Sequence, residues 1–296
     1  MSVFAQFAVN GIIAGSVYAL IALGFAMIFT ASRVFHFAHG GVYTLSAFAG
    51  YTALVTFHLG TPAAFGAAIL VAVVLGTLIN ALLYEPMREK GVSSFVMMIC
   101  SFGVLIIMIN VTAMIWGSNP LVLSQGGLST VYRFGPIYIT DAQLQIIGFA
   151  ITLGVALWIF FQRFKLGIAI RALGNDSELA LIVGMPARIL RHISFAVGSA
   201  LVGISALMIG FNVGIIDYNM GLDIILMAVV AMIIGGLGNV GAAAGGGFML
   251  GMIQNLALWK IESKWQMALS FSILILVLLF RPSGLFGDSS RKWEGL

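Results

Sequence analysis

The sequence predicts an all-α fold, a polytopic bundle of transmembrane helices, and two observations carry this prediction. Only 8% of the residues are charged and 61% are hydrophobic, whereas soluble proteins carry about 25% charged residues. Long intervals also lack Asp, Glu, Lys and Arg altogether, at residues 1–32, 34–84, 91–132, 142–162, 193–216 and 224–259. A spanning helix needs about 20 mainly apolar residues. The unbroken runs do not fit the short alternating segments of a transmembrane β-barrel.

The first half of the chain has room for four spans. We expect them at about residues 7–30, two within 34–84 and one at 94–116. The break within the second interval falls near Gly60 and Pro62, which interrupt the helical pattern. In the first span, Gly11 and Gly15 form a small-xxx-small pair that lets another helix approach closely.

The second half begins with a loop at 117–140, in which Gly and Pro stand among β-favouring Val, Tyr and Ile. This composition predicts an ordered external loop containing a hairpin. Further membrane segments are expected at about 142–161, 193–213, two within 223–259, and 266–280. The interval 223–259 is too long for one span, because roughly 36 helical residues would reach over 50 Å against a core of about 30 Å. The total is about eight to nine membrane segments in a single transmembrane domain, residues 1–296.

Glycines mark the division of the 223–259 interval, and we expect a helix break near 235–247. The glycines assigned to this break are Gly235, Gly236, Gly238 and Gly241. Gly236, Gly238 and Gly241 also match the G-x-G-x-x-G dinucleotide pattern, but that motif needs a strand–helix unit in a soluble sheet. Membrane segments flank this one, so close helix packing and a broken helix explain the glycines better.

The distribution of Lys and Arg predicts the orientation. Most of the 14 basic residues fall on one side when Arg33, the 85–90 loop, the 163–191 loop and the C-terminal tail are placed together. Cytoplasmic loops carry the excess of basic residues, so this side is expected to be cytoplasmic and the N-terminus external. The same bias accounts for the net charge of +4, and no nucleic-acid partner is expected.

The 163–191 loop gathers charge that the rest of the chain lacks, which predicts that it binds a soluble partner. Residues 171–185 fit a short amphipathic helix or a pair of turns, capped by Asp176 and ended by Gly184. Leu179, Ala180 and Val183 would form an exposed apolar stripe suited to docking in a groove. The predicted coupling residues are Arg171, Asp176, Glu178, Leu179, Ala180, Val183 and Gly184. The alternative is a connector lying on the bilayer surface, which acidic residues disfavour against anionic lipid.

No enzymatic site is evident in the sequence. There is no Gly-Lys dipeptide and hence no P-loop, so we expect that the chain does not itself hydrolyse ATP through a Walker-type site and needs an external source of energy. His36 and His39 could share a helix face, but no third ligand accompanies them, so no metal site and no cofactor are expected. Composition alone leads to a transporter or channel subunit.

Several short motifs, distributed along the whole chain, extend this interpretation. They comprise Asn10-Gly11 through Gly15, Tyr18-Ala19-Leu20, Gly24, Phe37-Ala38-His39-Gly40, Arg171-Ala172, Asp176, Ala180, Gly184, the glycines from Gly235 to Gly246, and Arg281-Pro282-Ser283-Gly284-Leu285-Phe286-Gly287. On these residues the sequence resembles, nearly end to end, the LivH-type permease family of bacterial ABC importers for branched-chain amino acids. The family commonly has Asn at the position of His36 and an acidic residue at that of Gly41, and the same scaffold serves urea and short-amide importers.

The resemblance implies a permease of the bacterial inner membrane that pairs with a second, homologous permease. Two cytoplasmic ATPase subunits, which bind the ATP, and a periplasmic solute-binding protein would complete the importer, with the 163–191 loop as the coupling segment. The candidate pathway residues are Asn10, Tyr18, Phe37, His39, Gly40 and Asn212. They are neutral or apolar, so we expect a small neutral or zwitterionic solute. An ion-coupled secondary transporter is the rival, but it needs charged residues in mid-membrane, and Asp141, Asp217 and Asp223 fall near span ends.

Overall fold

The computed structural model describes residues 2–123, 130–135 and 137–287, which are mostly helical. Part of the predicted external loop, at 124–129 and 136, and the end of the C-terminal tail lie outside the described residues. Contacts divide the chain into two compact units. The first holds residues 1–23, 126–156 and 226–292, and the second holds 24–125, 157–225 and 293–296.

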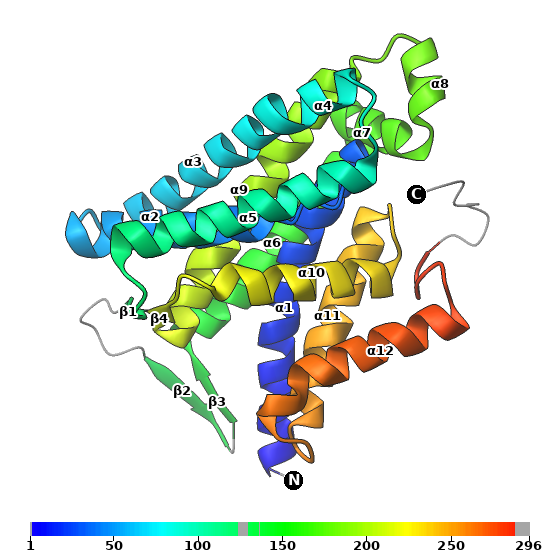
Figure 1. Cartoon of the computed structure of the whole chain (residues 1–296). Coiled ribbons are helices and arrows are strands. Elements are labelled where there is room, and N and C mark those ends of the chain that lie inside the picture. The colour runs from blue at the N-terminus through cyan, green and yellow to red at the C-terminus, as the bar shows by residue number, and fades with distance from the viewer. Residues whose placement is uncertain (1, 124–129, 136, 288–296) are drawn as a thin grey trace. The chain divides into compact units, whose positions relative to one another are not determined.

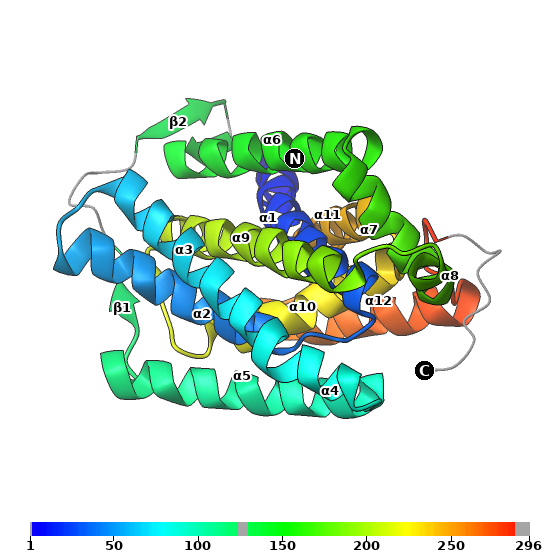
Figure 2. The ribbon, with the colours of Figure 1, turned by 90° about the horizontal axis from the view of Figure 1, so that it is seen from above.

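The second unit is built from long helices. Its elements are the end of α1 (Ser2–Ser32), α2 (Ala38–Tyr51) with the π-helical turn η1 (Thr52–Thr56), α3 (Thr61–Ile79) with the π-helical turn η2 (Asn80–Tyr84), α4 (Glu85–Glu89), α5 (Ser94–Trp116), the end of α6 (Asp141–Arg163), α7 (Lys165–Asn175), α8 (Ser177–Ile182), α9 (Ala187–Val213) and the first residues of α10 (Met220–Gly235). Helices α2, α3, α5 and α9 run side by side (Figure 1, Figure 2). The short strands β1 (Leu121–Val122) and β4 (Ile215–Ile216) pair antiparallel in the same unit.

Helix α3 shows which residues the buried face of an apolar helix contains. Its buried residues are small and recur every fourth position: Ala64, Ala68, Ala72 and Gly76. Leu70, Val74 and Leu78 are exposed instead. Small residues let the backbone approach a neighbour, and lipid accepts large aliphatic side chains as readily as a protein core does. Indeed, a Cβ on Gly203 of α9 would lie 2.8 Å from the carbonyl oxygen of Ala68.

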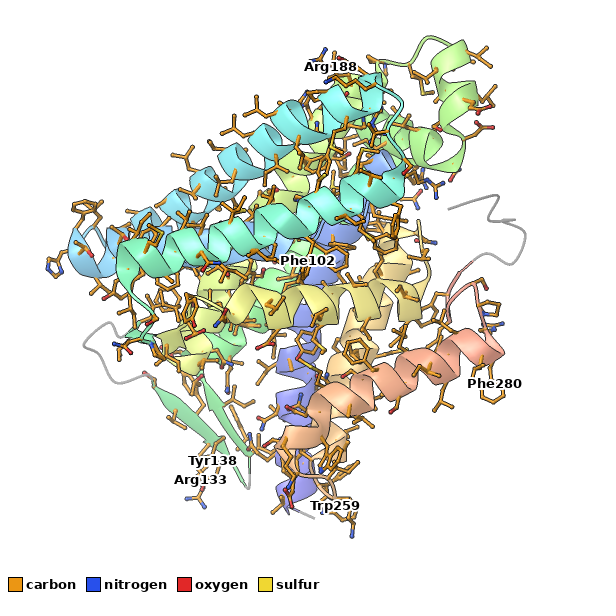
Figure 3. All side chains as sticks on the ribbon, viewed as in Figure 1. Phe102, Arg133, Tyr138, Arg188, Trp259 and Phe280 are labelled. Atoms are coloured by element: carbon orange, nitrogen blue, oxygen red, sulfur yellow. The ribbon has the colours of Figure 1, made fainter. Side chains whose placement is uncertain are left out.

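The first unit contains a hairpin and three apolar helices of the C-terminal half. Its elements are the start of α1, β2 (Val131–Phe134), β3 (Ile137–Thr140), the start of α6, most of α10, α11 (Val240–Ala257), η3 (Ser263–Trp265) and α12 (Gln266–Phe280). Strands β2 and β3 pair antiparallel, which confirms the hairpin predicted in the 117–140 loop. The guanidinium of Arg133 lies 5.5 Å from the ring centroid of Tyr138 across this hairpin (Figure 3).

Gly11 and Gly15 pack against α11, as their spacing predicts. A Cβ on Gly15 would lie 2.6 Å from the carbonyl oxygen of Phe248, and a Cβ on Gly11 would lie 3.0 Å from the sulfur of Met252. The two helices therefore touch through backbone, which only small residues allow.

The predicted break in the 223–259 interval is present but shorter than expected. Helices α10 and α11 are bent by 115° at residues 236–239, where Gly236 (φ +135°) and Gly238 (φ +79°) adopt left-handed conformations. The Asn239 side chain accepts a hydrogen bond from the Ala242 N–H at 3.1 Å and begins α11. Gly241 and the glycines after it belong to α11 and do not form part of the break.

The glycine break is also where the C-terminal motif binds. The N–H groups of Leu285 and Phe286 donate to the carbonyl oxygens of Ile234 and Gly235 at 2.8 and 2.9 Å. These bonds satisfy carbonyls at the end of α10 that have no partner within the helix. Two sequence motifs whose bonded residues are 51 positions apart therefore form one structural feature.

In the described residues, six helices are long and apolar enough to cross a membrane, or seven segments if the bent α10–α11 pair counts as one span. The expected eight to nine segments are therefore not confirmed, although a polytopic helical protein is. Two intervals account for the difference. The 34–84 interval holds only one such helix, which begins at Thr61, because α2 with η1 is not among them, and the 223–259 interval holds a bent pair.

Candidate functional site

The 163–191 loop folds into two short helices, α7 and α8, followed by the first turn of α9. Asp176 separates α7 from α8, and its carboxylate accepts a hydrogen bond from the Leu179 N–H at 2.8 Å. The predicted cap is thus confirmed. Gly184, at φ +77°, ends this segment, and Pro186 precedes α9.

Four apolar side chains are exposed on α8 and at the residue that follows it. Ile182 is 81% exposed, and Leu179, Leu181 and Val183 are exposed as well. Ala180 is 3% exposed, so its prediction as part of the exposed stripe is wrong. Helix α8 packs against α7, and Ala180 is its buried residue. The apolar surface of the loop is therefore Leu179, Leu181, Ile182 and Val183, which we call the α8 tip.

The segment is anchored on its N-terminal side by Arg33. This guanidinium donates a hydrogen bond to the carbonyl oxygen of Gly174, in the last turn of α7. A Cβ on Gly174 would lie 2.8 Å from the carbonyl oxygen of Thr30, so α7 touches the end of α1 through backbone. Arg88 of α4 in turn donates to the Ser32 carbonyl at 2.9 Å, which satisfies the last carbonyl of α1.

On its C-terminal side, the segment is anchored by an ion pair between Arg191 of α9 and Glu85 of α4. The Arg191 Nε and Nη2 atoms donate to the two Glu85 carboxylate oxygens at 2.7 and 2.9 Å. The side chains are 12% and 3% exposed. A second pair joins the same two helices, with Arg188 and Glu89 3.6 Å apart and both well exposed.

The structure therefore gathers three charged segments at one end of the second unit. Arg33, the 85–90 loop and the 163–191 loop contact one another through these bonds, and α4, α7 and α8 lie at the same end (Figure 1). The distribution of Lys and Arg predicted that these three segments share one side of the membrane. It did not predict the Glu85–Arg191 pair, whose residues are 106 positions apart. The available signal was a carboxylate at the end of a long uncharged interval, which needs a partner if it is buried.

A buried polar cluster adjoins the ion pair. His36 Nδ1 and the Tyr84 hydroxyl are 2.8 Å apart, and the ring of Phe195 lies 5.1 Å from that of His36. His39 is 1% exposed, with its ring 5.5 Å from that of His36. The sequence analysis singled out His39 but missed Tyr84. Among the described residues, no group of three or more His, Cys, Asp or Glu could hold a metal ion.

The candidate pathway residues belong to both units. In the second unit, the Phe37 ring packs 5.9 Å from that of Phe102, and Gly40 lies against the backbone of Gly221. Asn212 is exposed near the end of α9, remote from His39 at the start of α2. Asn10 accepts a hydrogen bond from Gln6 at 3.0 Å in the first unit, which also contains the half-buried Tyr18. Their common role in a pathway stays a prediction.

These features define a polytopic helical membrane protein with an anchored, charged segment that bears exposed apolar side chains. Comparison with known proteins gives the family. Residues 7–278 match the family described as branched-chain amino acid transport system / permease component, and the chain belongs to this family.

Several relatives align over nearly the whole chain. The high-affinity branched-chain amino acid transport system permease protein BraD of Pseudomonas aeruginosa is 28% identical, over 96% of each chain. LivH of Escherichia coli, which carries the same description, is 29% identical over 96% of each chain. A probable branched-chain amino acid transport permease protein of Methanocaldococcus jannaschii is 26% identical over 97% of this chain and 94% of its own.

One solved structure shares the fold. PsaBC from Streptococcus pneumoniae, in complex with Fab, aligns with a TM-score of 0.53 over 94% of this chain and 93% of its own. The sequence identity is 15%, so this similarity concerns the fold alone.

Proposed function

We propose that this chain is the membrane permease of an ATP-driven importer for branched-chain or other hydrophobic amino acids. The full-length match to the permease family supports the role, and the printed names of the relatives support the solute class. Urea or a short amide is the alternative solute. The candidate pathway residues offer no fixed charge for a strongly anionic solute, which fits a zwitterion.

The observation that carries the coupling proposal is the α8 tip. Exposed aliphatic side chains on an aqueous segment are unfavourable unless something covers them. A short amphipathic helix that lays its apolar face into a groove is a common mode of recognition. The covering partner in this proposal is one of two cytoplasmic ATPase subunits. Asp176 and Glu178 beside the tip disfavour anionic lipid as the alternative cover.

The same proposal includes the orientation of the chain in the membrane and the subunits that complete the importer. The end that carries Arg33, α4 and the 163–191 loop is the cytoplasmic one, because basic residues concentrate there, and the C-terminus lies on that side as well. The N-terminus is external, together with the β2–β3 hairpin, whose Tyr138 N–H donates to Gln6 at 2.8 Å. A second homologous permease and a periplasmic solute-binding protein complete the importer in the bacterial inner membrane.

Substitutions at the α8 tip test this proposal. Leu181→Asp and Ile182→Asp should leave the chain inserted and folded but remove most of the ATPase subunits that purify with it. Ile261→Asp is the matched control, since it makes the same chemical change at an exposed apolar residue in the opposite loop. ATPase retention by both tip variants at the level of this control would refute docking at α8.

A further inference from the structure

We propose that Glu85 and Arg191 are positioning residues that pass movement of the docked segment to the membrane helices. This inference rests on the proposed function, since it takes α8 as the ATPase contact. It adds a defined route by which that contact reaches the transmembrane part, through a pair of side chains that the family match does not identify.

The cost of burying these two charges is the first argument. The chain has few charged residues, and this pair lies 12% and 3% exposed at the end of two apolar helices. A buried ion pair contributes little net stability compared with apolar residues of similar size, but leaving either charge alone is strongly unfavourable. Such a pair therefore holds α4 and α9 in one relative position, because sliding the two helices apart would separate the buried charges. Both carboxylate oxygens are engaged, which fixes orientation as well as distance.

The position of the pair is the second argument. Arg191 stands in the second turn of α9, directly after the α8 segment, and its neighbours Ala187 and Leu190 are buried. Glu85 follows Tyr84, whose hydroxyl contacts His36 at 2.8 Å. His36 lies in the connection between α1 and α2, which also carries Phe37 and precedes His39. One continuous series of contacts thus joins the docked segment to the start of α2.

The ion pair differs in kind from the other contacts of the segment. Helix α7 packs against α9, and Arg33 binds the carbonyl oxygen of Gly174 at the end of α7. Neither of these contacts is a buried pair of opposite charges. Arg188 and Glu89 join the same helices as the buried pair, but they are 64% and 65% exposed and 3.6 Å apart. Exposed pairs of this kind contribute little, because water screens them.

The experiment uses the complete importer in proteoliposomes and measures solute molecules transported per ATP hydrolysed. Glu85→Gln and Arg191→Gln should each lower this ratio about tenfold, while the ATPase subunits still purify with the membrane part. The exchanged variant, Glu85→Arg with Arg191→Glu, should recover much of the ratio. Glu89→Gln is the matched control on the same helix, and it should leave the ratio unchanged.

Several results would overturn the inference. A normal ratio in both single variants would do so, and so would an exchanged variant no better than either single one. Loss of the ATPase subunits from these variants would also contradict it, since the pair would then shape the docking surface. If the glutamine variants fold poorly, Arg191→Lys keeps the charge with fewer hydrogen bonds and should lower the ratio about threefold; an unchanged ratio would refute the role. Normal ATPase retention by the α8 tip variants is a distinguishable failure, since it would refute docking at α8 and with it the premise of this route.

Discussion

Gly24 of α1 and Gly198 of α9 meet backbone to backbone, so that a Cβ on either would lie 2.6 Å from the carbonyl oxygen of the other. This reciprocal contact lies beside His39, whose ring nitrogen would be 3.4 Å from a Cβ on Gly24. No side chain can be added at either position unless the two helices separate. Close backbone contact of this kind replaces the hydrophobic driving force that helices lack in lipid.

We therefore expect Gly198→Ala to destabilise the protein by about 1–3 kcal/mol, the usual effect of overpacking. Thermal unfolding of the purified chain in detergent measures the change. Gly103→Ala in α5 is the control, since nothing lies within 4 Å of a Cβ there. Equal stability of the two variants would show that the α1–α9 contact is looser than described.

The contact of Gly284 with the glycine break gives a second prediction. Gly284 has φ +83°, and a Cβ there would lie 2.5 Å from the Gly236 Cα, whereas Gly91 has φ +69° and nothing within 4 Å. Both alanine variants carry a similar backbone strain, but only Gly284→Ala adds a clash. We expect it to cost about 1–3 kcal/mol more than Gly91→Ala, again by thermal unfolding. If the two variants unfold at the same temperature, the C-terminal motif does not pack on the glycine break.

The cap at Asp176 is testable by hydrogen exchange. Asp176→Ala removes the acceptor for the Leu179 N–H and should cost about 1 kcal/mol of local stability. Exchange in α8, residues 177–182, should then quicken by roughly fivefold. Asp176→Asn keeps a capping oxygen and should exchange like the parent protein. Unchanged exchange in the alanine variant would mean that α8 is held by its contacts alone.

Labelling of single cysteines tests the proposed orientation. Ser177 in α8 and Ser263 after α11 are exposed, and the account places them on the cytoplasmic and external sides, respectively. In a Cys100→Ser background, a membrane-impermeant thiol reagent added to intact cells should label Ser263→Cys but not Ser177→Cys. Labelling of both from outside would invalidate the charge-based orientation.

Fold class could be predicted because membrane helices are determined by composition over long windows. The position of the helix break followed from Gly236 and Gly238, since left-handed backbone favours glycine. The number of segments could not be predicted in the same way. The 34–84 interval is uncharged throughout, and the break within it followed from Gly60 and Pro62, since α3 begins at Thr61. The helix before this break, however, is not among those long and apolar enough to cross a membrane.

The candidate site was predictable only where its chemistry is local. The cap could be predicted because it joins Asp176 to the N–H of Leu179, only three positions later in the sequence. The burial of Ala180 depends on how a six-residue helix folds back on α7, and periodicity over so short a stretch does not fix which face is covered. The Glu85–Arg191 pair joins residues on different helices, so one sequence without aligned relatives cannot pair them.

The central claim is that this chain conducts amino acids across the membrane at the expense of ATP hydrolysed by its partners. The most direct test is uptake of radiolabelled leucine into proteoliposomes that contain the permease pair and ATPase subunits, with the binding protein added outside and ATP enclosed. The account predicts uptake that requires ATP and the binding protein, is lost with Ile182→Asp, and is outcompeted by isoleucine or valine but not by succinate. Uptake that proceeds equally without ATP, or a di- or tricarboxylate as the preferred solute, would contradict it.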